Sequence, residues 1–215
     1  MAKITSPVKL FMPIGVYKGI QSFTHSQRRF AKSAAFIGTV HIYTARGEGL
    51  IVEARSDLMA VKYYVGPESY VYAGEDDCEM NLDVIVPVTD LPCESLDEQL
   101  EITLGQNEAV FCNKKTGRVG AVSYVDGVYK DEWEASFFKE LDDAGPVGNS
   151  HRAIPSAFYS SSLLSAITAL TDIQRAERNS HPTVAMSIRR NGSVVLMPEP
   201  AGYLGSRIKA VVMGW

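Results

Sequence analysis

The chain has 215 residues, 46% of them hydrophobic and 21% charged, with a net charge of −4. This length allows one large or two small domains, and the composition excludes a mainly disordered, collagen-like or coiled-coil protein. No apolar run approaches the roughly 18 residues of a membrane span, and no signal peptide is recognisable at the start.

The small net charge hides a segregation along the chain. Residues 1–47 contain no acidic residue, residues 48–101 contain only Arg55 and Lys62 as basic residues, and the part after residue 144 is basic again. Such segregation predicts one surface that meets a polyanion on an otherwise acidic body. Two alternatives remain open: chance clustering of charges on solvated faces, and an acid-poor organelle transit peptide.

The three cysteines Cys78, Cys93 and Cys112 are widely spaced and form no CxxC pair. This spacing supports neither a zinc ribbon nor a thioredoxin-like site. We expect free thiols in a reducing compartment, and therefore a cytoplasmic protein.

The first predicted elements are a strand over residues 8–12 and a helix over residues 14–35 that begins at Pro13. One side of this helix is apolar. The other is polar, basic and free of acids, with Lys18, Gln21, His25, Arg28, Arg29 and Lys32. Three strands follow, over residues 39–45, 50–54 and 59–65. The result is a strand, a helix and three strands, a unit that we call a module.

The pattern repeats in weaker form. A strand over residues 80–86 is followed by residues 87–98, which hold at most a short helix because Pro92 interrupts them. The next three strands are predicted over residues 100–104, 109–112 and 119–125. The stretch 126–149 is acidic and irregular, and we interpret it as a connector.

The third module is clear. Residues 153–158 have the pattern of a strand, and residues 160–178 that of a helix with serine caps and an apolar stripe of Leu163, Leu164, Ile167 and Leu170. Strands follow over residues 184–189 and 194–197, joined at the hairpin signal Asn191-Gly192. A strand over residues 208–213 closes the chain.

Signatures of catalysis are missing from the sequence. It contains no GxxxxGK[ST], GxSxG, HExxH or GxGxxG motif, and its four histidines have no carboxylate or cysteine at metal-ligand spacing. The sequence therefore predicts a non-enzymatic binding protein with no cofactor and no metal.

The repeated module, about 70 residues long, resembles the building block of DNA sliding clamps. The C-terminal part is the most specific: "FYSSSLLSAITAL", "PTVAMSIRRNGSVVLMPE" and "RIKAVVMGW" look like the last module of the bacterial DNA polymerase III β clamp, which closes on a strand of the "YVVMP" kind. The final Gly214-Trp215 departs from that pattern. The resemblance is to a divergent clamp, of the kind found in phages.

The resemblance implies an α+β fold of repeated β-α-β-β-β modules, with helices on one face of antiparallel sheets. It implies a first clamp-like domain of two modules over residues 1–125, the connector over 126–149, and a second domain with one clear module over 150–215. Clamp domains carry two modules each, so a fourth module would have to be hidden in the connector. Three modules in one chain are too few to close a ring, so a clamp of this length must self-associate.

Site residues follow from the same resemblance. Sequence-independent contacts with duplex DNA would come from the helices, through Lys18, His25, Arg28, Arg29, Lys32, Arg175 and Arg178. A pocket for short peptides of polymerases or clamp loaders would involve Val211, Met213 and Trp215. Three other functions stay open: a virion or assembly protein that uses its sheets for self-association, a nucleic-acid-binding protein that uses the first helix directly, and an enzyme without a recognisable motif.

Overall fold

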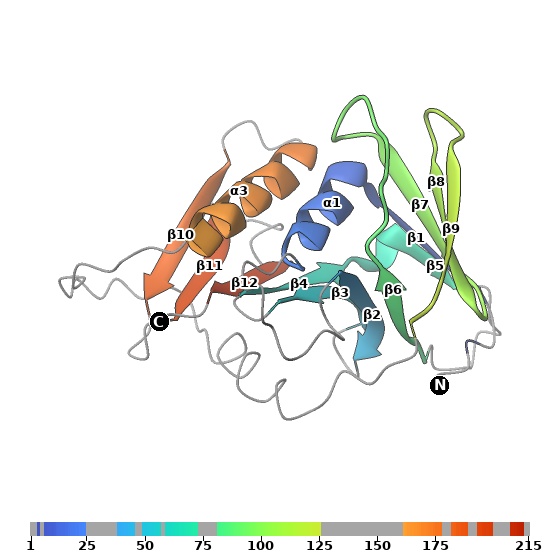
Figure 1. The fold of residues 1–215 in the computed structure, drawn as a ribbon, viewed down its shortest axis with the longest axis horizontal. Coiled ribbons are helices and arrows are strands. Elements are labelled where there is room, and N and C mark those ends of the chain that lie inside the picture. Colours follow the sequence, from blue (N-terminus) through green and yellow to red (C-terminus); the bar gives the residue numbers. More distant parts are fainter. Residues whose placement is uncertain are drawn as a thin grey trace.

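Two antiparallel sheets and two helices make up the described part of the protein, which is known from a computed structural model (Figure 1). The structure describes residues 4, 7–24, 38–45, 49–56, 59–72, 81–125, 161–177, 182–188, 193–199 and 207–212. The α+β fold class, with helices on one face of antiparallel sheets, is confirmed.

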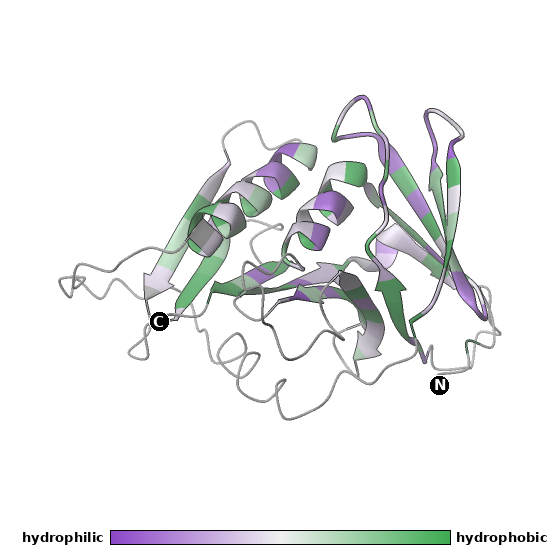
Figure 2. Ribbon diagram, in the orientation of Figure 1, coloured by the Kyte–Doolittle hydropathy of each residue, from purple (hydrophilic) through white to green (hydrophobic). Residues whose placement is uncertain are grey.

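The five-stranded sheet has the strand order β5-β1-β7-β8-β9. Its strands are β1 (Val8–Pro13), β5 (Tyr70–Tyr72), β7 (Gln99–Leu104), β8 (Glu108–Asn113) and β9 (Val119–Ser123). Buried and more exposed residues alternate along β7 and β8, as expected for strands with one face in the core. Figure 2 shows the same alternation as green and purple bands.

The seven-stranded sheet has the order β10-β11-β12-β4-β3-β2-β6. Its strands are β2 (Thr39–Ala45), β3 (Gly49–Arg55), β4 (Met59–Val65), β6 (Asp83–Pro87), β10 (Thr183–Ile188), β11 (Val194–Glu199) and β12 (Ile208–Val212). The antiparallel pairing of β12 with β4 joins the last module to the first in one sheet. A 3-10 turn, η1 (Pro67–Ser69), leads from β4 to β5.

The helices α1 (Ile14–Ser22) and α3 (Ser161–Ala176) lie side by side on one side of the seven-stranded sheet (Figure 1). They approach closely because α1 carries glycine where it meets α3: a Cβ on Gly15 would stand 2.6 Å from the Cβ of Ala176. The core lies beneath them and includes Val16, Ile20 and Ile173, all fully buried.

Two halves of the first 125 residues repeat the same arrangement. The first strand of each half pairs in the sheet of the other half. In the seven-stranded sheet β6 lies next to β2, β3 and β4, and in the five-stranded sheet β1 lies next to β7, β8 and β9. In the first half α1 follows β1, whereas in the second half the loop 88–98 follows β6 without a helix. This confirms that the Pro92 segment interrupts helix formation.

Strand predictions agree with the structure to within three residues at each end, apart from β5, which is too short to show a periodic pattern. The helix predicted over residues 14–35 is too long, because α1 ends at Ser22. The predicted stripe of the last helix is wrong at Leu164, which is 64% exposed, while Leu163 and Leu170 are buried. The predicted strand over 153–158 and the connector lie outside the described residues, and the domain division stays a prediction.

Candidate nucleic-acid and partner surfaces

Most residues of the first helix are shielded from solvent. Every residue of α1 is buried except Lys18 and Ser22, which are half-buried. Its Tyr17 packs against Phe111 of β8, with ring centroids 5.4 Å apart, so α1 contacts both sheets. The described part of α1 is therefore a core element, and the basic face expected for it begins only with Lys18.

Lys18 is directed to the loop 88–98. Its ammonium donates to the carbonyl of Leu91 over 3.3 Å and lies 3.8 Å from the sulfur of Cys93. Of the other predicted DNA contacts, His25, Arg28, Arg29 and Lys32 lie outside the described residues. Those side chains remain predictions.

The outer surface of α3 is mostly polar. Ser165, Thr168 and Arg175 are exposed there, beside the exposed Leu164. The Arg175 guanidinium lies 3.4 Å from a carboxylate oxygen of Asp172, one turn earlier on the same helix. Arg175 is thus accessible, as a DNA contact requires, while Arg178 lies outside the described residues.

The loop 88–98 takes the place of the second helix and is held by Glu98. This buried carboxylate accepts hydrogen bonds from Asn113 Nδ2 at 2.7 Å and from the backbone N–H groups of Glu94 and Ser95. Lys115 lies 3.2 Å from it. The Asn113 hydrogen bond, followed by those of Lys115 and the two backbone groups, lowers the pKa of Glu98.

We expect Asn113→Ala to destabilise the protein by about 1–3 kcal/mol, because it leaves a buried carboxylate without its best donor. Asn113→Asp should be worse at neutral pH, since two carboxylates would then face each other. Urea unfolding measures both changes. Equal stability of the wild type and Asn113→Ala would show that Glu98 does not hold the loop.

The end of α3 is tied to β4 by a second buried contact. Tyr63 donates its hydroxyl hydrogen to Glu177 over 2.8 Å. Burial raises the pKa of Glu177 above the ordinary carboxyl value, although Tyr63 and Arg207 oppose the shift. The folded protein therefore holds this proton to higher pH than the unfolded chain does.

Because the folded-state pKa is raised, Glu177 stabilises the protein most at low pH and loses that contribution as the pH rises through the folded value. Glu177→Gln keeps an acceptor for Tyr63 but cannot ionise. We expect the variant to gain stability relative to the wild type as the pH rises above about 4, since an unperturbed Glu titrates near 4.3. Melting temperatures across this range measure it, and a constant difference would contradict it.

Of the three residues predicted to form a peptide pocket, the described part of the structure contains only Val211. Val211 lies in β12 between β4 and β11 and is fully buried on the sheet face that points away from the helices. Met213 and Trp215 lie outside the described residues.

Charged groups are buried on the same outer face of the seven-stranded sheet. His41, Glu53 and Lys62 are buried and stand opposite one another on β2, β3 and β4, and the half-buried Lys209 of β12 stands opposite Lys62. His41 Nε2 lies 2.7 Å from Asp83, and burial raises the pKa of Glu53. Glu53 stands between the basic residues His41 and Lys62, so we assign these three side chains to joining β2, β3 and β4, whereas Lys209 faces the like charge of Lys62.

Among the described residues, each sheet has one end strand of five or more residues without a charged side chain, whereas the end strand β6 carries Asp83. The edge strand β9 reads VGAVS, and Val119 is 65% exposed. The edge strand β10 reads TVAMSI, and Met186 is 48% exposed. These strands lie at opposite ends of the long axis (Figure 1). Sequence reasoning identified both strands, but not that they are edges, because edge status depends on which strands pair.

Two kinds of site were not found in the described parts of the chain. They contain no group of three or more His, Cys, Asp or Glu residues arranged to hold a metal ion. None of their helices is long and apolar enough to cross a membrane.

The sequence matches no protein-family model and no curated protein. The structure, in contrast, is similar to bacterial sliding clamps over the whole chain. A DNA polymerase III beta subunit of Eubacterium rectale matches with a TM-score of 0.53 and 9% identity, and 67% of that chain is covered. A sliding clamp of Bartonella birtlesii, solved with griselimycin, matches with a TM-score of 0.52, 12% identity and 67% coverage.

A beta sliding clamp of C. crescentus matches with a TM-score of 0.52, 9% identity and 68% coverage of its chain. At such low identity the likeness shows the fold alone. The chain thus has the fold of a divergent sliding clamp and spans about two thirds of the length of these clamps.

Proposed function

We propose that this protein is a sliding-clamp-like processivity factor, which encircles duplex DNA as a homo-oligomeric ring and tethers replication proteins. It acts without catalytic residues or a cofactor, in the cytoplasm. Its partners are duplex DNA of any sequence, short peptides of a DNA polymerase or clamp loader, and further copies of itself.

The observation that carries the proposal is the layout of the two sheets. Both helices lie on one side, and among the described residues the uncharged strands β9 and β10 are edge strands at opposite ends of the long axis (Figure 1). Soluble proteins usually protect exposed edges with charged residues or proline. Uncharged edges at the two ends favour head-to-tail pairing of copies, which closes into a ring when the rotation allows it.

A ring of this kind has the helices on its inner side when the sheets form its outer wall. Duplex DNA would then face the hydroxyls of α3, Arg175, and the basic residues that follow α1. Attraction to phosphates does not depend on base sequence, so a ring that relies on it can slide. The proposal for the peptide pocket rests on Val211, Met213 and Trp215, at the end of the strand that joins the first and last modules.

Two measurements test the function. Light scattering should give the mass of a multimer. Retention on nicked circular DNA should exceed retention on linear DNA, because a ring leaves through a free end. Tight binding to short linear duplexes would favour a protein that grips nucleic acid with its first helix. A monomer at all concentrations would contradict the ring.

A further inference from the structure

One exposed cation differs from the other cations in the described part of the chain. The ion-paired ones are Lys9 and Lys114 with Glu101, Lys115 with Glu94 and Glu98, Arg175 with Asp172, and Arg207 with Glu68. Those buried or half-buried are Lys18, Arg55, Lys62 and Lys209. Arg118 alone is exposed with no acidic side chain of the described residues at ion-pair distance from its guanidinium. It is therefore the described cation most available to an anion from outside the chain.

Arg118 lies on the helix side of the five-stranded sheet. It comes directly before β9, in which Gly120 stands opposite the core residue Phe111 of β8. Side chains two residues apart in a strand share a face, so Arg118 has the same orientation as Gly120. Its carbonyl accepts the N–H of Asn113, whose side chain is buried on this side against Glu98.

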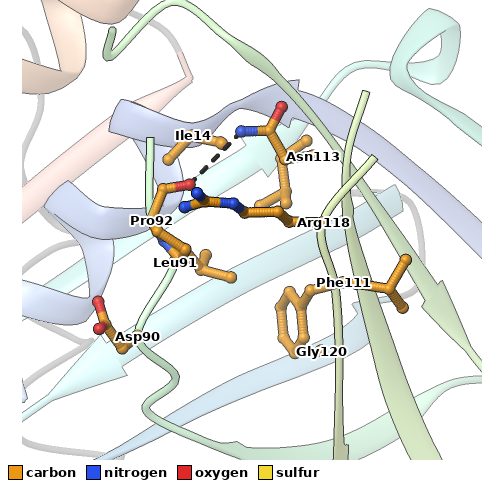
Figure 3. Close-up of a pocket in the computed structure, with 10 residues that line it drawn as sticks. Ile14, Asp90, Leu91, Pro92, Phe111, Asn113, Arg118 and Gly120 are labelled. Atoms are coloured by element: carbon orange, nitrogen blue, oxygen red, sulfur yellow. Dashed lines mark hydrogen bonds between the residues drawn. The ribbon is translucent and has the colours of Figure 1, made fainter. Parts of the chain in front are cut away.

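The Arg118 side chain crosses from the β8–β9 hairpin toward the loop 88–98. Figure 3 shows it extending to the region of Pro92, above Leu91, at the rim of a small cavity. The floor of this cavity consists of residues that are already buried, such as Leu100 and Phe111. What this rim presents to solvent is therefore the guanidinium and not an apolar surface.

The surface next to Arg118 leaves room for a large ligand. Gly120, the next residue on the same face, is exposed, and a Cβ added there would meet no atom within 4 Å. The loop 88–98 stands where the first half of the protein has a helix, and no described helix covers this part of the sheet (Figure 1). A ligand as wide as a nucleic-acid duplex can approach such a surface.

The charges around Arg118 select an anion. Of the acidic groups on the loop, Glu94 and Glu98 are neutralised by Lys115. Asp90 lines the same cavity as Arg118 and opposes its charge, but forms no ion pair with it. A guanidinium offers a phosphate two parallel hydrogen bonds, and its charge is permanent.

We propose that Arg118 contacts a backbone phosphate of duplex DNA and is the DNA contact of the second half of the protein, the half that has no helix. The cations predicted to meet DNA all belong to the segment of the first helix or to that of the last. Arg118 adds one from the hairpin between them, on the side that faces DNA in the proposed ring. This inference rests on the proposed function and names a residue for it.

The salt dependence of DNA retention tests the contact. Arg118→Ala should lower the slope of the logarithm of the binding constant against the logarithm of salt concentration by about 1. The binding constant should fall by about eightfold at 0.1 M salt, and the loss should vanish toward about 1 M. Arg118→Lys keeps the charge and should keep the slope. Circular dichroism checks that the variants fold.

The matched control is Lys114→Ala in the same hairpin. Lys114 is also an exposed cation, but it is paired with Glu101, which shares the opposite face of the sheet with Lys9. Its removal should change the slope little. An equal fall in the slope for Lys114→Ala and Arg118→Ala would show a general effect of net charge and would overturn the assignment.

Asp90 provides a change of opposite sign. Asp90→Asn removes the negative charge that lines the same cavity, so retention on DNA should rise. Glu108→Gln removes an exposed acid at the start of β8 and should leave retention unchanged. A rise for Glu108→Gln equal to that for Asp90→Asn would contradict a phosphate beside Arg118.

The outcomes separate the two proposals. If the wild type is retained better on circular than on linear DNA but Arg118→Ala has the wild-type slope, the Arg118 contact is wrong and the proposed function stands. If the wild type shows no preference for circular DNA and no salt-dependent binding, both proposals are wrong.

Discussion

Gly15→Ala is expected to lower the melting temperature of the protein by about 4–8 °C. The new Cβ would stand 2.6 Å from the Cβ of Ala176 on α3, and 2.8 Å and 2.9 Å from the Cβ and the carbonyl oxygen of Leu96. The carbonyl cannot easily move, because it accepts a hydrogen bond from the N–H of Gly15 itself. The added methyl group therefore pushes a helix and a loop at once.

Overpacking a core by a methyl group costs about 1–3 kcal/mol, and this two-sided contact belongs at the upper end. Replacing glycine by alanine in a helix returns about 1 kcal/mol. The net loss of about 2 kcal/mol corresponds to the stated shift, since each kcal/mol moves the melting temperature of a protein of this size by about 2–4 °C.

The matched control is Gly120→Ala, the same substitution at a position with open space, which should leave the melting temperature nearly unchanged. Gly19→Ala should also destabilise, because its Cβ would meet the side chain of Ile173. If Gly15→Ala proves as stable as the wild type, the helix and the loop are not packed as closely as described.

The triple variant Arg28→Ala, Arg29→Ala and Lys32→Ala is expected to reduce retention on circular DNA strongly. Each cation that contacts a phosphate contributes roughly one unit to the slope of the logarithm of the binding constant against the logarithm of salt concentration. The triple variant should therefore lower that slope by up to about 3. Retention should fall most at low salt, where the electrostatic contribution is largest.

Lys18 is left out of this variant because it also holds the loop 88–98 through the Leu91 carbonyl. The control is the double variant Lys9→Ala and Lys114→Ala. It removes two exposed cations that flank Glu101 on the five-stranded sheet, away from the helices. It should change the salt slope little. An unchanged slope in the triple variant would contradict the proposed DNA-facing role of this segment.

Local pattern was enough to predict most elements of this protein. Alternation in residues 39–45, and the breakers Ser56-Asp57 and Gly66-Pro67 around residues 59–65, predicted both strands with their observed bounds. Pro92 likewise indicated that no long helix follows β6, because proline breaks the hydrogen-bond ladder from within the segment. The repeat of these elements led to the clamp fold.

The candidate surfaces were harder to predict. Lys18 has the helical spacing of a free basic face, yet its ammonium is used by a loop more than 70 residues away in sequence. Leu164 has the spacing of the apolar stripe but is exposed, because α1 packs on α3 from one side only. Such contacts depend on where a second element lies. The spacing of apolar and charged residues within one helix does not indicate that position.

The sequence by itself determined where strands and helices begin, which parts are acidic or basic, and that the chain repeats a module. These properties are set by neighbours a few residues apart. Only the tertiary structure decided that β4 pairs with β12, that a loop covers the place of a helix, and that β9 and β10 are edges among the described strands. The reason is that strand pairing between distant segments is selected by the packing of the whole core.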